Sequence, residues 1–264
     1  MRSVEISTIR SIQEIFFRLL QDVNSLRQCI REDTMRAVLK IGGSLLYDDT
    51  GKVLTDRIRR YAATVRSLVK EGHQLVIVVG GGKPARVFIN AARELGATEA
   101  QCDWFGIKLA RHNAELLCVS LGDIAYPKVV ESLDELETAM CSGKVVLMGG
   151  LLPGQSTNAA AALAAESVRA EKMLNATNVD GVYDHDPSQP GAKRLDTVDI
   201  AQLRTILARS GTRAGEYELF DAVAIGVVER SKIETVIFDG TDPENILRLF
   251  RGKRVGSTIV HGSK

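Results

Sequence analysis

The sequence has few cysteines, few aromatic residues and no long uninterrupted apolar run. Its four cysteines, Cys29, Cys102, Cys118 and Cys141, form no CxxC pair, which favours reduced thiols over a disulfide or zinc framework. Nothing approaches the ~20 apolar residues that a membrane span requires. The formal net charge of +1 gives no strong field toward nucleic acid or an anionic membrane. We therefore expect a cytoplasmic protein that binds neither, and any anion must be held by local geometry.

Several common catalytic signatures are also missing. The chain has no GxSxG elbow and no HExxH motif, and it lacks the GxxxxGK[ST] phosphate loop. Its four histidines are scattered along the sequence, which favours solvated or structural roles over a set of metal ligands. No pair of carboxylates suited to acid–base hydrolysis stands out. We therefore predict no protein-bound metal site and no hydrolase of these types.

Apolar segments of strand length alternate with helical patterns from Met35 onward. Strands that are apolar throughout and alternate with helices predict a mainly parallel sheet covered on both faces. The expected fold is a three-layer α/β/α sandwich, with residues 35–264 as one domain and a polar loop or hairpin at 180–195. Strands are expected near 38–41, 74–79, 144–150, 172–178 and 234–240, and helices near 55–72, 83–95, 103–121 and 159–170.

Residues 1–34 are interpreted as a separate N-terminal extension. Within 11–30 (SIQEIFFRLLQDVNSLRQCI) apolar residues recur at helical spacing, which predicts an amphipathic helix. Charges interrupt every apolar run and no small-residue cleavage site follows, so a signal peptide is not expected. Two interpretations remain open. The segment is either an extra helix that covers a subunit or domain surface, or a leader upstream of a true start at Met35.

Three predicted strands end in glycine, at KIGGS (40–44), VGGGK (79–83) and MGGLLPGQST (148–157). Ligands of open α/β sheets bind beyond the carboxyl ends of the strands, where glycine lets the backbone approach them. A helix expected after each of the later two turns adds unpaired N–H groups, which favour anions. Lys40 and Arg86 supply cations. One such turn is often purely structural, and Arg86 could be a solvated helix residue. Three together favour two facing phosphates, which is typical of phosphoryl transfer.

The order of the motifs resembles that of the amino-acid kinase superfamily, and within it the uridylate (UMP) kinases of archaeal type. The resemblance runs from KIGGS through VGGGKPAR, CDWFGIKLARHNAELL and GGLLPGQST to ATNVDGVYDHDP and AGEYELFDAVAIGVVERSKI. It implies transfer of the γ-phosphoryl of ATP to UMP, giving UDP and ADP in pyrimidine nucleotide biosynthesis. It also implies Mg²⁺ bound to the nucleotide and a homo-oligomer, commonly a hexamer.

The resemblance further implies a role for individual residues. Lys40 would be the catalytic residue that stabilises the charge of the moving γ-phosphoryl. Asp103 would bind the ribose hydroxyls of UMP, although from the residues alone it could be a helix N-cap, as could Thr157. Tyr183 and Asp186 could likewise serve only to order their own loop. The implied ATP contacts are Lys40, Ile41, Gly42, Gly43, Ser44, Gly82, Arg86, Thr177, Asn178, Tyr183 and Asp186. The implied UMP contacts are Gly81, Asp103, Leu151, Leu152, Pro153, Gly154, Gln155, Ser156 and Thr157.

Two positions depart from the pattern of many superfamily members. Asn158 stands where many have an aspartate that orients the catalytic cations. Asn178 stands where many bacterial relatives have a second lysine that faces the transferring group. We therefore expect Lys40, Mg²⁺ and helix N-termini to carry most of the charge stabilisation.

Two alternatives remain open at this point. One is a kinase of the same fold with another acceptor, such as isopentenyl phosphate, fosfomycin, carbamate or acetylglutamate. Isopentenyl phosphate and fosfomycin kinases carry a histidine shortly after the second glycine turn, and residues 83–95 contain none. The polar LLPGQST segment also suits a nucleotide base better than an isoprenoid tail. The other alternative is a catalytically inactive nucleotide-binding scaffold; Lys40 argues against it, and Asn158 keeps it open.

Overall fold

The computed structural model describes residues 34–185, 189–209 and 220–261. The helix predicted within residues 11–30 and the predicted ATP contact Asp186 both lie outside these residues. The division of the chain at residue 34 therefore stays a prediction.

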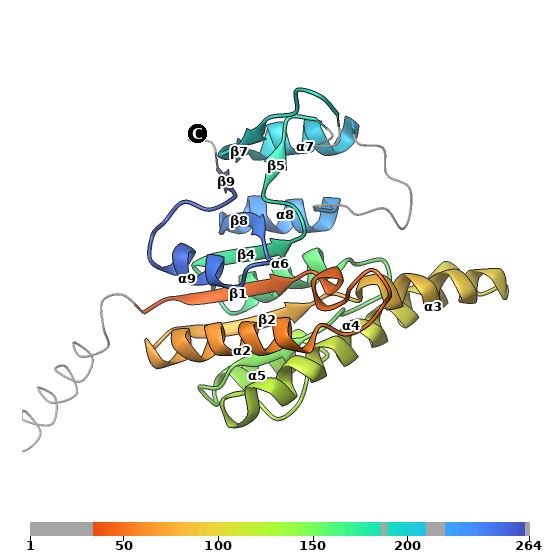
Figure 1. Ribbon diagram of the computed structural model, residues 1–264, viewed down its shortest axis with the longest axis horizontal. Coiled ribbons are helices and arrows are strands. Elements are labelled where there is room, and N and C mark those ends of the chain that lie inside the picture. The colour runs from red at the N-terminus through yellow and green to blue at the C-terminus, as the bar shows by residue number, and fades with distance from the viewer. Residues whose placement is uncertain (1–33, 186–188, 210–219, 262–264) are drawn as a thin grey trace, which may run out of the picture. The chain divides into compact units, whose positions relative to one another are not determined.

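A central sheet organises the fold (Figure 1). Neighbouring strands are parallel except for β8 and β9, which pair antiparallel. Most of these strands are short apolar segments whose side chains are buried on both faces, as expected for a parallel sheet between helices. Within the described residues the sheet has seven strands, in the order β3 (Val146–Met148), β2 (Gln74–Val79), β1 (Arg36–Ile41), β4 (Lys172–Thr177), β8 (Glu234–Asp239), β9 (Ser257–Val260) and β7 (Thr197–Asp199).

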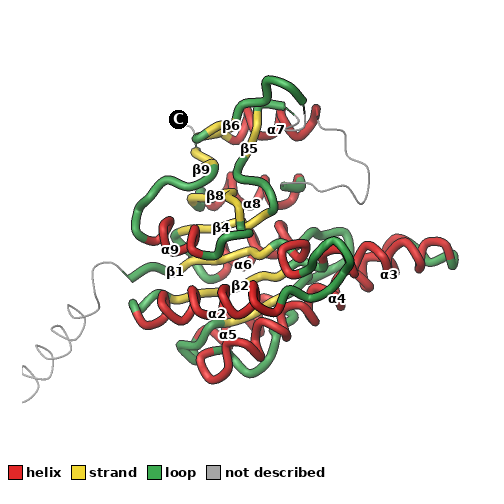
Figure 2. The backbone as a smooth tube through the Cα atoms, viewed as in Figure 1, coloured by secondary structure: helices red, strands yellow, loops and turns green. Residues whose placement is uncertain are grey.

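Helices cover both faces of the sheet (Figure 2). The sheet separates two hydrophobic clusters, and successive residues of β1 belong to different ones. Leu39 packs with one set of helices and Val38 with the other. The predicted mainly parallel α/β/α sandwich is therefore confirmed. The Leu39 side is covered by α2 (Thr55–Lys70), α4 (Glu99–Leu121) and α9 (Glu244–Phe250), and the Val38 side by α5 (Leu133–Met140), α6 (Thr157–Ser167), α7 (Ile200–Arg209) and α8 (Ala222–Ser231).

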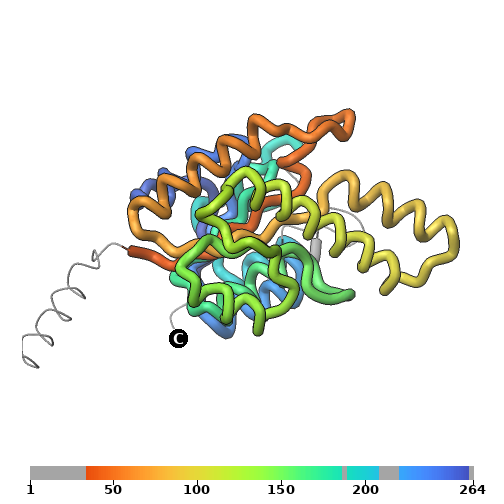
Figure 3. The backbone as a smooth tube through the Cα atoms, turned by 90° about the horizontal axis from the view of Figure 1, so that it is seen from below, coloured from red at the N-terminus to blue at the C-terminus, as the bar shows by residue number. Residues whose placement is uncertain are grey.

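One helical hairpin projects beyond the sheet. It consists of α3 (Gly82–Glu94) and the first half of α4, which run side by side (Figure 3). The polar segment at 180–195 forms a second, smaller hairpin, with β5 (Val182–Tyr183) antiparallel to β6 (Arg194–Leu195). The hairpin interpretation of that segment is thus confirmed.

Two helix starts differ from the sequence interpretation. The α4 helix begins at Glu99, because Thr98 and Gln101 form a capping box in front of it and satisfy N–H groups that would otherwise be unpaired. Asp103 lies one turn inside the helix, so the alternative role of Asp103 as an N-cap is wrong. At α6 the N-cap is Ser156, and the capping role considered for Thr157 is wrong for the same reason.

Candidate functional site

The first two glycine turns are in direct backbone contact. A Cβ atom added to Gly43 would lie 2.3 Å from the carbonyl oxygen of Gly80 and 2.3 Å from the nitrogen of Gly82. Gly82 also has a φ of 69°, which favours glycine. The third turn reaches the same point, since a Cβ atom on Gly80 would lie 3.4 Å from Oγ1 of Thr157. The structure therefore brings all three turns together at the carboxyl ends of β1, β2 and β3, and we call this place the junction.

Lys40 is a buried cation beside the junction. On β1 it lies between Val78 of β2 and Asn175 of β4 in register, and its Nζ atom would be 3.9 Å from a Cβ atom on Gly42. Its side chain is 4% exposed, and burial lowers its pKa to about 8. Within the described residues, its ammonium group has no hydrogen-bond or ion-pair partner. Because a buried charge without a partner is costly, this geometry is suited to a bound anion.

The lowered pKa of Lys40 makes anion binding pH-dependent. A phosphate beside the ammonium raises the lysine pKa again, so ATP binding near pH 8 should take up a fraction of a proton. Calorimetry in buffers of different ionisation enthalpy measures this uptake, and Lys40→Met should abolish it. Equal uptake by both proteins would show that another group titrates.

The same pKa shift affects stability, with a defined sign. The folded-state pKa lies below the ordinary value of 10.5, so the ammonium of Lys40 destabilises the ligand-free fold below about pH 8. The penalty disappears as the pH rises toward 10.5. The free energy of unfolding of Lys40→Met should therefore exceed that of the wild type most clearly below about pH 8.

Two neutral amides lie on the α6 side of the junction. Asn175 is the β4 neighbour of Lys40, and its Nδ2 donates to Oδ1 of Asn158 at 3.3 Å. Both amide side chains are buried. An aspartate at position 158 would place a negative charge here, next to the strand position that faces Lys40. The asparagine keeps this side neutral.

The starts of helices α6 and α8 are tied together. Oγ of Ser156 accepts hydrogen bonds from the N–H groups of Asn158 at 3.0 Å and Ala159 at 3.2 Å. The same hydroxyl donates to the carboxylate of Asp221, which caps α8 by accepting from the N–H of Ala224 at 2.9 Å. The residue that ends the third glycine turn is thus fixed on two helices at once, and the N-terminus of α6 is held at the junction.

Removing the Ser156 cap should have a local and a functional effect. Ser156→Ala should lower the free energy of unfolding by about 1 kcal/mol and weaken the affinity for the predicted UMP ligand of the 151–157 loop. Ser132→Ala is the matched control, because Ser132 caps α5 in the same way. It should lose comparable stability in urea denaturation without a change in UMP affinity. Equal affinity losses in the two variants would contradict a specific role for Ser156.

Asp103 holds the 151–157 loop against α4. Its Oδ2 atom accepts a hydrogen bond from the N–H of Gly154 at 2.7 Å. Within this loop Leu151 is buried and Leu152 is 57% exposed, so the loop is anchored at its start and open at its tip. The contact of Asp103 with the ribose hydroxyls of UMP stays a prediction. The carboxylate does bind the loop that is expected to hold UMP.

The predicted ATP residues Thr177, Asn178, Tyr183 and Arg86 lie at the carboxyl end of β4, in the β5–β6 hairpin and on α3. Thr177 is buried and its hydroxyl donates to the carbonyl of Val179 at 2.8 Å, whereas Asn178 is exposed. The hydroxyl of Tyr183 donates to Asp180 at 2.8 Å, so Tyr183 does order its own loop, as the residues alone suggested. Arg86 is exposed on α3. Contacts of these residues with ATP stay predictions.

The contribution of α4 to the junction was not predicted from the sequence. Asn113 binds the second glycine turn through two hydrogen bonds, and Nε of Arg111 donates to the carbonyl of Gly150 in the third turn at 3.3 Å. Gly149 lets the helix come this close, since a Cβ atom there would lie 2.6 Å from the nitrogen of Arg111. The available signal was a polar residue, Asn113, within an otherwise apolar helical face.

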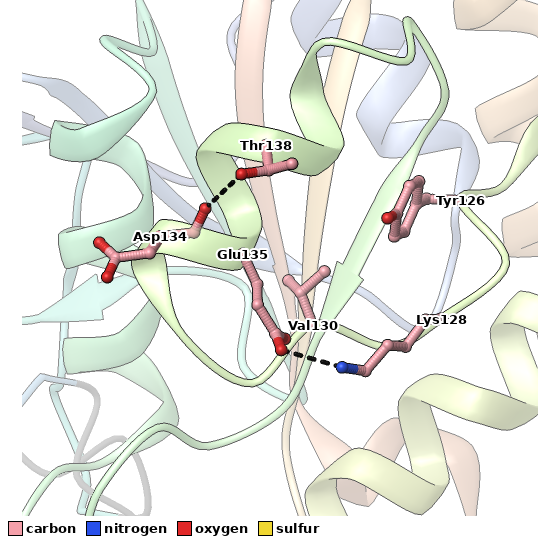
Figure 4. Close-up of a pocket in the computed structure, with 6 residues that line it drawn as sticks. All are labelled: Tyr126, Lys128, Val130, Asp134, Glu135 and Thr138. Atoms are coloured by element: carbon pink, nitrogen blue, oxygen red, sulfur yellow. Dashed lines mark hydrogen bonds and ion pairs between the residues drawn. The ribbon is translucent and has the colours of Figure 1, made fainter.

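A pocket beside α5 is separate from these residues (Figure 4). Its polar groups bind one another: Nζ of Lys128 lies 2.9 Å from Oε1 of Glu135, and the hydroxyl of Thr138 donates to the carbonyl of Asp134 at 3.0 Å. None of its residues belongs to the predicted site. The lining residues are Tyr126, Lys128, Val130, Asp134, Glu135 and Thr138.

Some negative findings apply to the described part of the chain. No group of three or more His, Cys, Asp or Glu side chains is arranged to hold a metal ion there. Among the same residues, no helix is both long enough and apolar enough to cross a membrane. Cys102, Cys118 and Cys141 are free thiols, while Cys29 lies outside the described residues.

Comparison with known proteins identifies the protein family to which this fold and this junction of glycine turns belong. The model of the amino acid kinase family matches residues 35–239, and the chain therefore belongs to this family. The match begins at Met35, the residue at which the motifs of the sequence begin. The resemblance inferred from those motifs is thereby confirmed.

Relatives found by sequence and by structure cover most of the chain. The uridylate kinase of Methanothermobacter thermautotrophicus is 44% identical over 227 residues, which cover 86% of this chain and 99% of that protein. The uridylate kinase of Methanobrevibacter smithii is 41% identical with the same coverage. The crystal structure of the uridylate kinase from Archaeoglobus fulgidus superposes with a TM-score of 0.76 at 42% identity, covering 86% of this chain and 100% of that one.

Proposed function

We propose that the protein transfers the γ-phosphoryl group of ATP to UMP, giving UDP and ADP, in the cytoplasmic synthesis of pyrimidine nucleotides. The observation that carries this proposal is Lys40, a buried residue whose ammonium has no protein partner among the described residues and lies beside two glycine turns in backbone contact. Phosphoryl transfer needs little covalent chemistry from a protein beyond positioning and charge stabilisation. A fixed cation and closely packed turns supply both.

In this proposal each glycine turn has a separate task. The first turn and Lys40 hold the β- and γ-phosphates of ATP, with the nucleoside toward the end of β4 at Thr177. Gly81 and the 151–157 loop hold the phosphate, ribose and base of UMP. The two phosphates then face each other across the contact between Gly43 and Gly82, which is the arrangement that in-line transfer requires.

Mg²⁺ enters this proposal with ATP. The neutral pair of Asn158 and Asn175 beside the junction supplies amide groups in place of carboxylates, so the ion would be held mainly through phosphate oxygens and water. When bound, it would neutralise charge on the phosphate chain. Of the protein's own groups, Lys40 and the helix N-termini would carry most of the charge stabilisation.

The choice of acceptor is supported by the relatives. Two proteins named uridylate kinase are 41–44% identical over 227 residues, which cover 86% of this chain. Residues 83–95 lack the histidine typical of isopentenyl phosphate and fosfomycin kinases. The decisive experiment is a coupled ADP-release assay with UMP, CMP, AMP and isopentenyl phosphate as acceptors. A strong preference for UMP is expected. Preferred turnover of another acceptor would show that UMP is not the substrate. ATP binding without any turnover would favour the alternative of a catalytically inactive nucleotide-binding scaffold.

We further propose that the protein is a homo-oligomer, with a hexamer as the expected state. The α3–α4 hairpin exposes an apolar surface on which Phe88 and Phe105 stack at 6.3 Å. If α4 packs antiparallel on the same helix of a second copy near His112, then Phe105 of one copy faces Val119 of the other. Between residues 87 and 119 the exposed large apolar residues, which extend along α4 beyond the hairpin, are Val87, Phe88, Leu95, Trp104, Phe105, Leu116 and Val119.

The assembly proposal is tested by the mass in solution. Val119 is 81% exposed, so Val119→Glu should leave the fold intact and reduce the mass to that of smaller species. An unchanged mass would exclude this surface as an interface. Deleting residues 1–34 tests the N-terminal extension separately: an unchanged oligomer would exclude a role for it in assembly.

A further inference from the structure

Two carbonyl groups of the second glycine turn, those of Gly80 and Gly81, accept hydrogen bonds from Asn113 of α4. Within the described residues no other side chain binds them. The Nδ2 atom of Asn113 donates to Gly80 O at 2.8 Å and to Gly81 O at 3.1 Å. Its Oδ1 accepts from the hydroxyl of Tyr47 at 2.6 Å. The Asn113 side chain is 1% exposed, so water cannot replace these bonds.

The two bonds to carbonyls determine where the N–H groups of the turn point. In a planar trans peptide the C=O and the following N–H point in opposite directions. With the carbonyls of Gly80 and Gly81 turned toward Asn113, the N–H groups of Gly81 and Gly82 are turned away from it. The nitrogen of Gly82 lies close to Gly43, since a Cβ atom on Gly43 would be 2.3 Å from it. Among the described residues, neither N–H group has a hydrogen-bond partner, so both are free to bind a ligand at this turn.

Tyr47 determines which way the amide of Asn113 faces. A hydroxyl that donates to Oδ1 leaves the NH₂ group on the side of the two carbonyls. Burial raises the pKa of Tyr47, which keeps its hydroxyl protonated as a donor. Tyr47 immediately follows the 3-10 helix Gly43–Leu46 of the first turn. One chain of hydrogen bonds therefore runs from the end of the first turn through Asn113 to the second.

We infer that Asn113 is a positioning residue, oriented by Tyr47, which sets the N–H groups of Gly81 and Gly82 to receive phosphate oxygens at the junction. The inference rests on the proposed function for the identity of the phosphates, but the geometry requires only an anionic phosphate ligand. Preorganised backbone donors stabilise developing charge more strongly than groups that must first reorient. The side chain acts through the turn without touching the substrate.

The near-isosteric variant Asn113→Asp tests this directly. It retains the volume of the side chain and its bond with Tyr47, but it turns carboxylate lone pairs toward two carbonyls. We expect kcat to fall about 10–100-fold. At lower pH a protonated carboxyl can donate to one carbonyl again, so the defect should shrink between about pH 8 and pH 6. A merely structural role would produce no such recovery.

Two further variants complete the experiment. Tyr47→Phe keeps both bonds to the turn but frees the amide to rotate, so kcat should fall by less, about 3–10-fold. Thr235→Val is the control, since Thr235 is equally buried and its hydroxyl donates to the carbonyl of Ile233, in the half of β8 away from the junction. Its thermal stability should fall while kcat is unchanged.

The outcomes separate this inference from the proposed function. If the wild type phosphorylates UMP and Asn113→Asp retains kcat within about twofold at every pH, the inference is overturned and the function stands. If the wild type phosphorylates no acceptor, the affinity for ATP decides instead: about tenfold weaker binding by Asn113→Asp supports the inference, and equal binding overturns it. If Asn113→Asp does not fold, an unchanged kcat in Tyr47→Phe overturns it.

Discussion

Replacing Lys40 with methionine should lower kcat by about 10²–10³-fold, with a smaller loss of ATP affinity. The ammonium lies in a low-dielectric environment beside the first glycine turn, where one fixed charge stabilises a transition state more than it would in water. The neutral Asn158 and Asn175 beside it offer no substitute. The loss should therefore be in the chemical step more than in binding.

The stability of this variant supplies an internal control. Methionine fills a similar volume without the desolvated charge, so the ligand-free protein should be at least as stable as the wild type. Lys172→Met is the matched variant, since Lys172 begins β4 and pairs with Glu234 at 2.9 Å at the opposite end of the strands. It should retain kcat. Near-normal turnover of Lys40→Met with intact ATP binding would remove Lys40 from its proposed role.

Gly43→Ala should be the other substitution with a large effect, because it separates the first two turns. The new methyl group would lie 2.3 Å from backbone atoms of both Gly80 and Gly82, and neither can move as a flexible side chain could. A displacement of about 1 Å at a reacting centre can cost about 10²-fold in rate. We expect at least this loss in kcat/KM, together with a lower thermal midpoint.

The matched control for Gly43→Ala is Gly226→Ala. Gly226 lies within α8, and a Cβ atom there would have nothing within 4 Å. Alanine is favoured over glycine in a helix by about 1 kcal/mol, so this variant should be slightly more stable and fully active. A Gly43→Ala enzyme with wild-type kcat/KM would contradict the close approach of the two turns as the basis of the site.

The sequence was sufficient for those parts of the molecule that depend on local pattern. Apolar runs such as 74–79 are strands, and glycine turns at the ends of β1 and β2 lie at one edge because parallel strands share their direction. The start of α4 was placed four residues late because the capping residue Thr98 precedes the apolar pattern. Capping chemistry, not hydrophobic periodicity, determines where that helix begins.

The parts that could not be predicted depend on contacts between distant segments. Asn113 and Gly80 are 33 residues apart, and Ser156 and Asp221 are 65 apart. Nothing in the local sequence of α4 or α8 indicates which backbone groups their polar side chains will meet. The short strand β9, antiparallel to β8, likewise follows from the tertiary arrangement, since its four residues form too short a pattern to be distinctive.

The central claim is that two phosphates face each other across the junction of the first two turns. It is tested most directly by the affinity for a bisubstrate analogue in which a chain of phosphates joins uridine to adenosine. If both halves bind at once, the second binding event becomes intramolecular, and calorimetry should give an affinity at least about 100-fold above that for ATP alone. An affinity no greater than that for ATP would contradict the claim, because the two sites would then not share one phosphate channel.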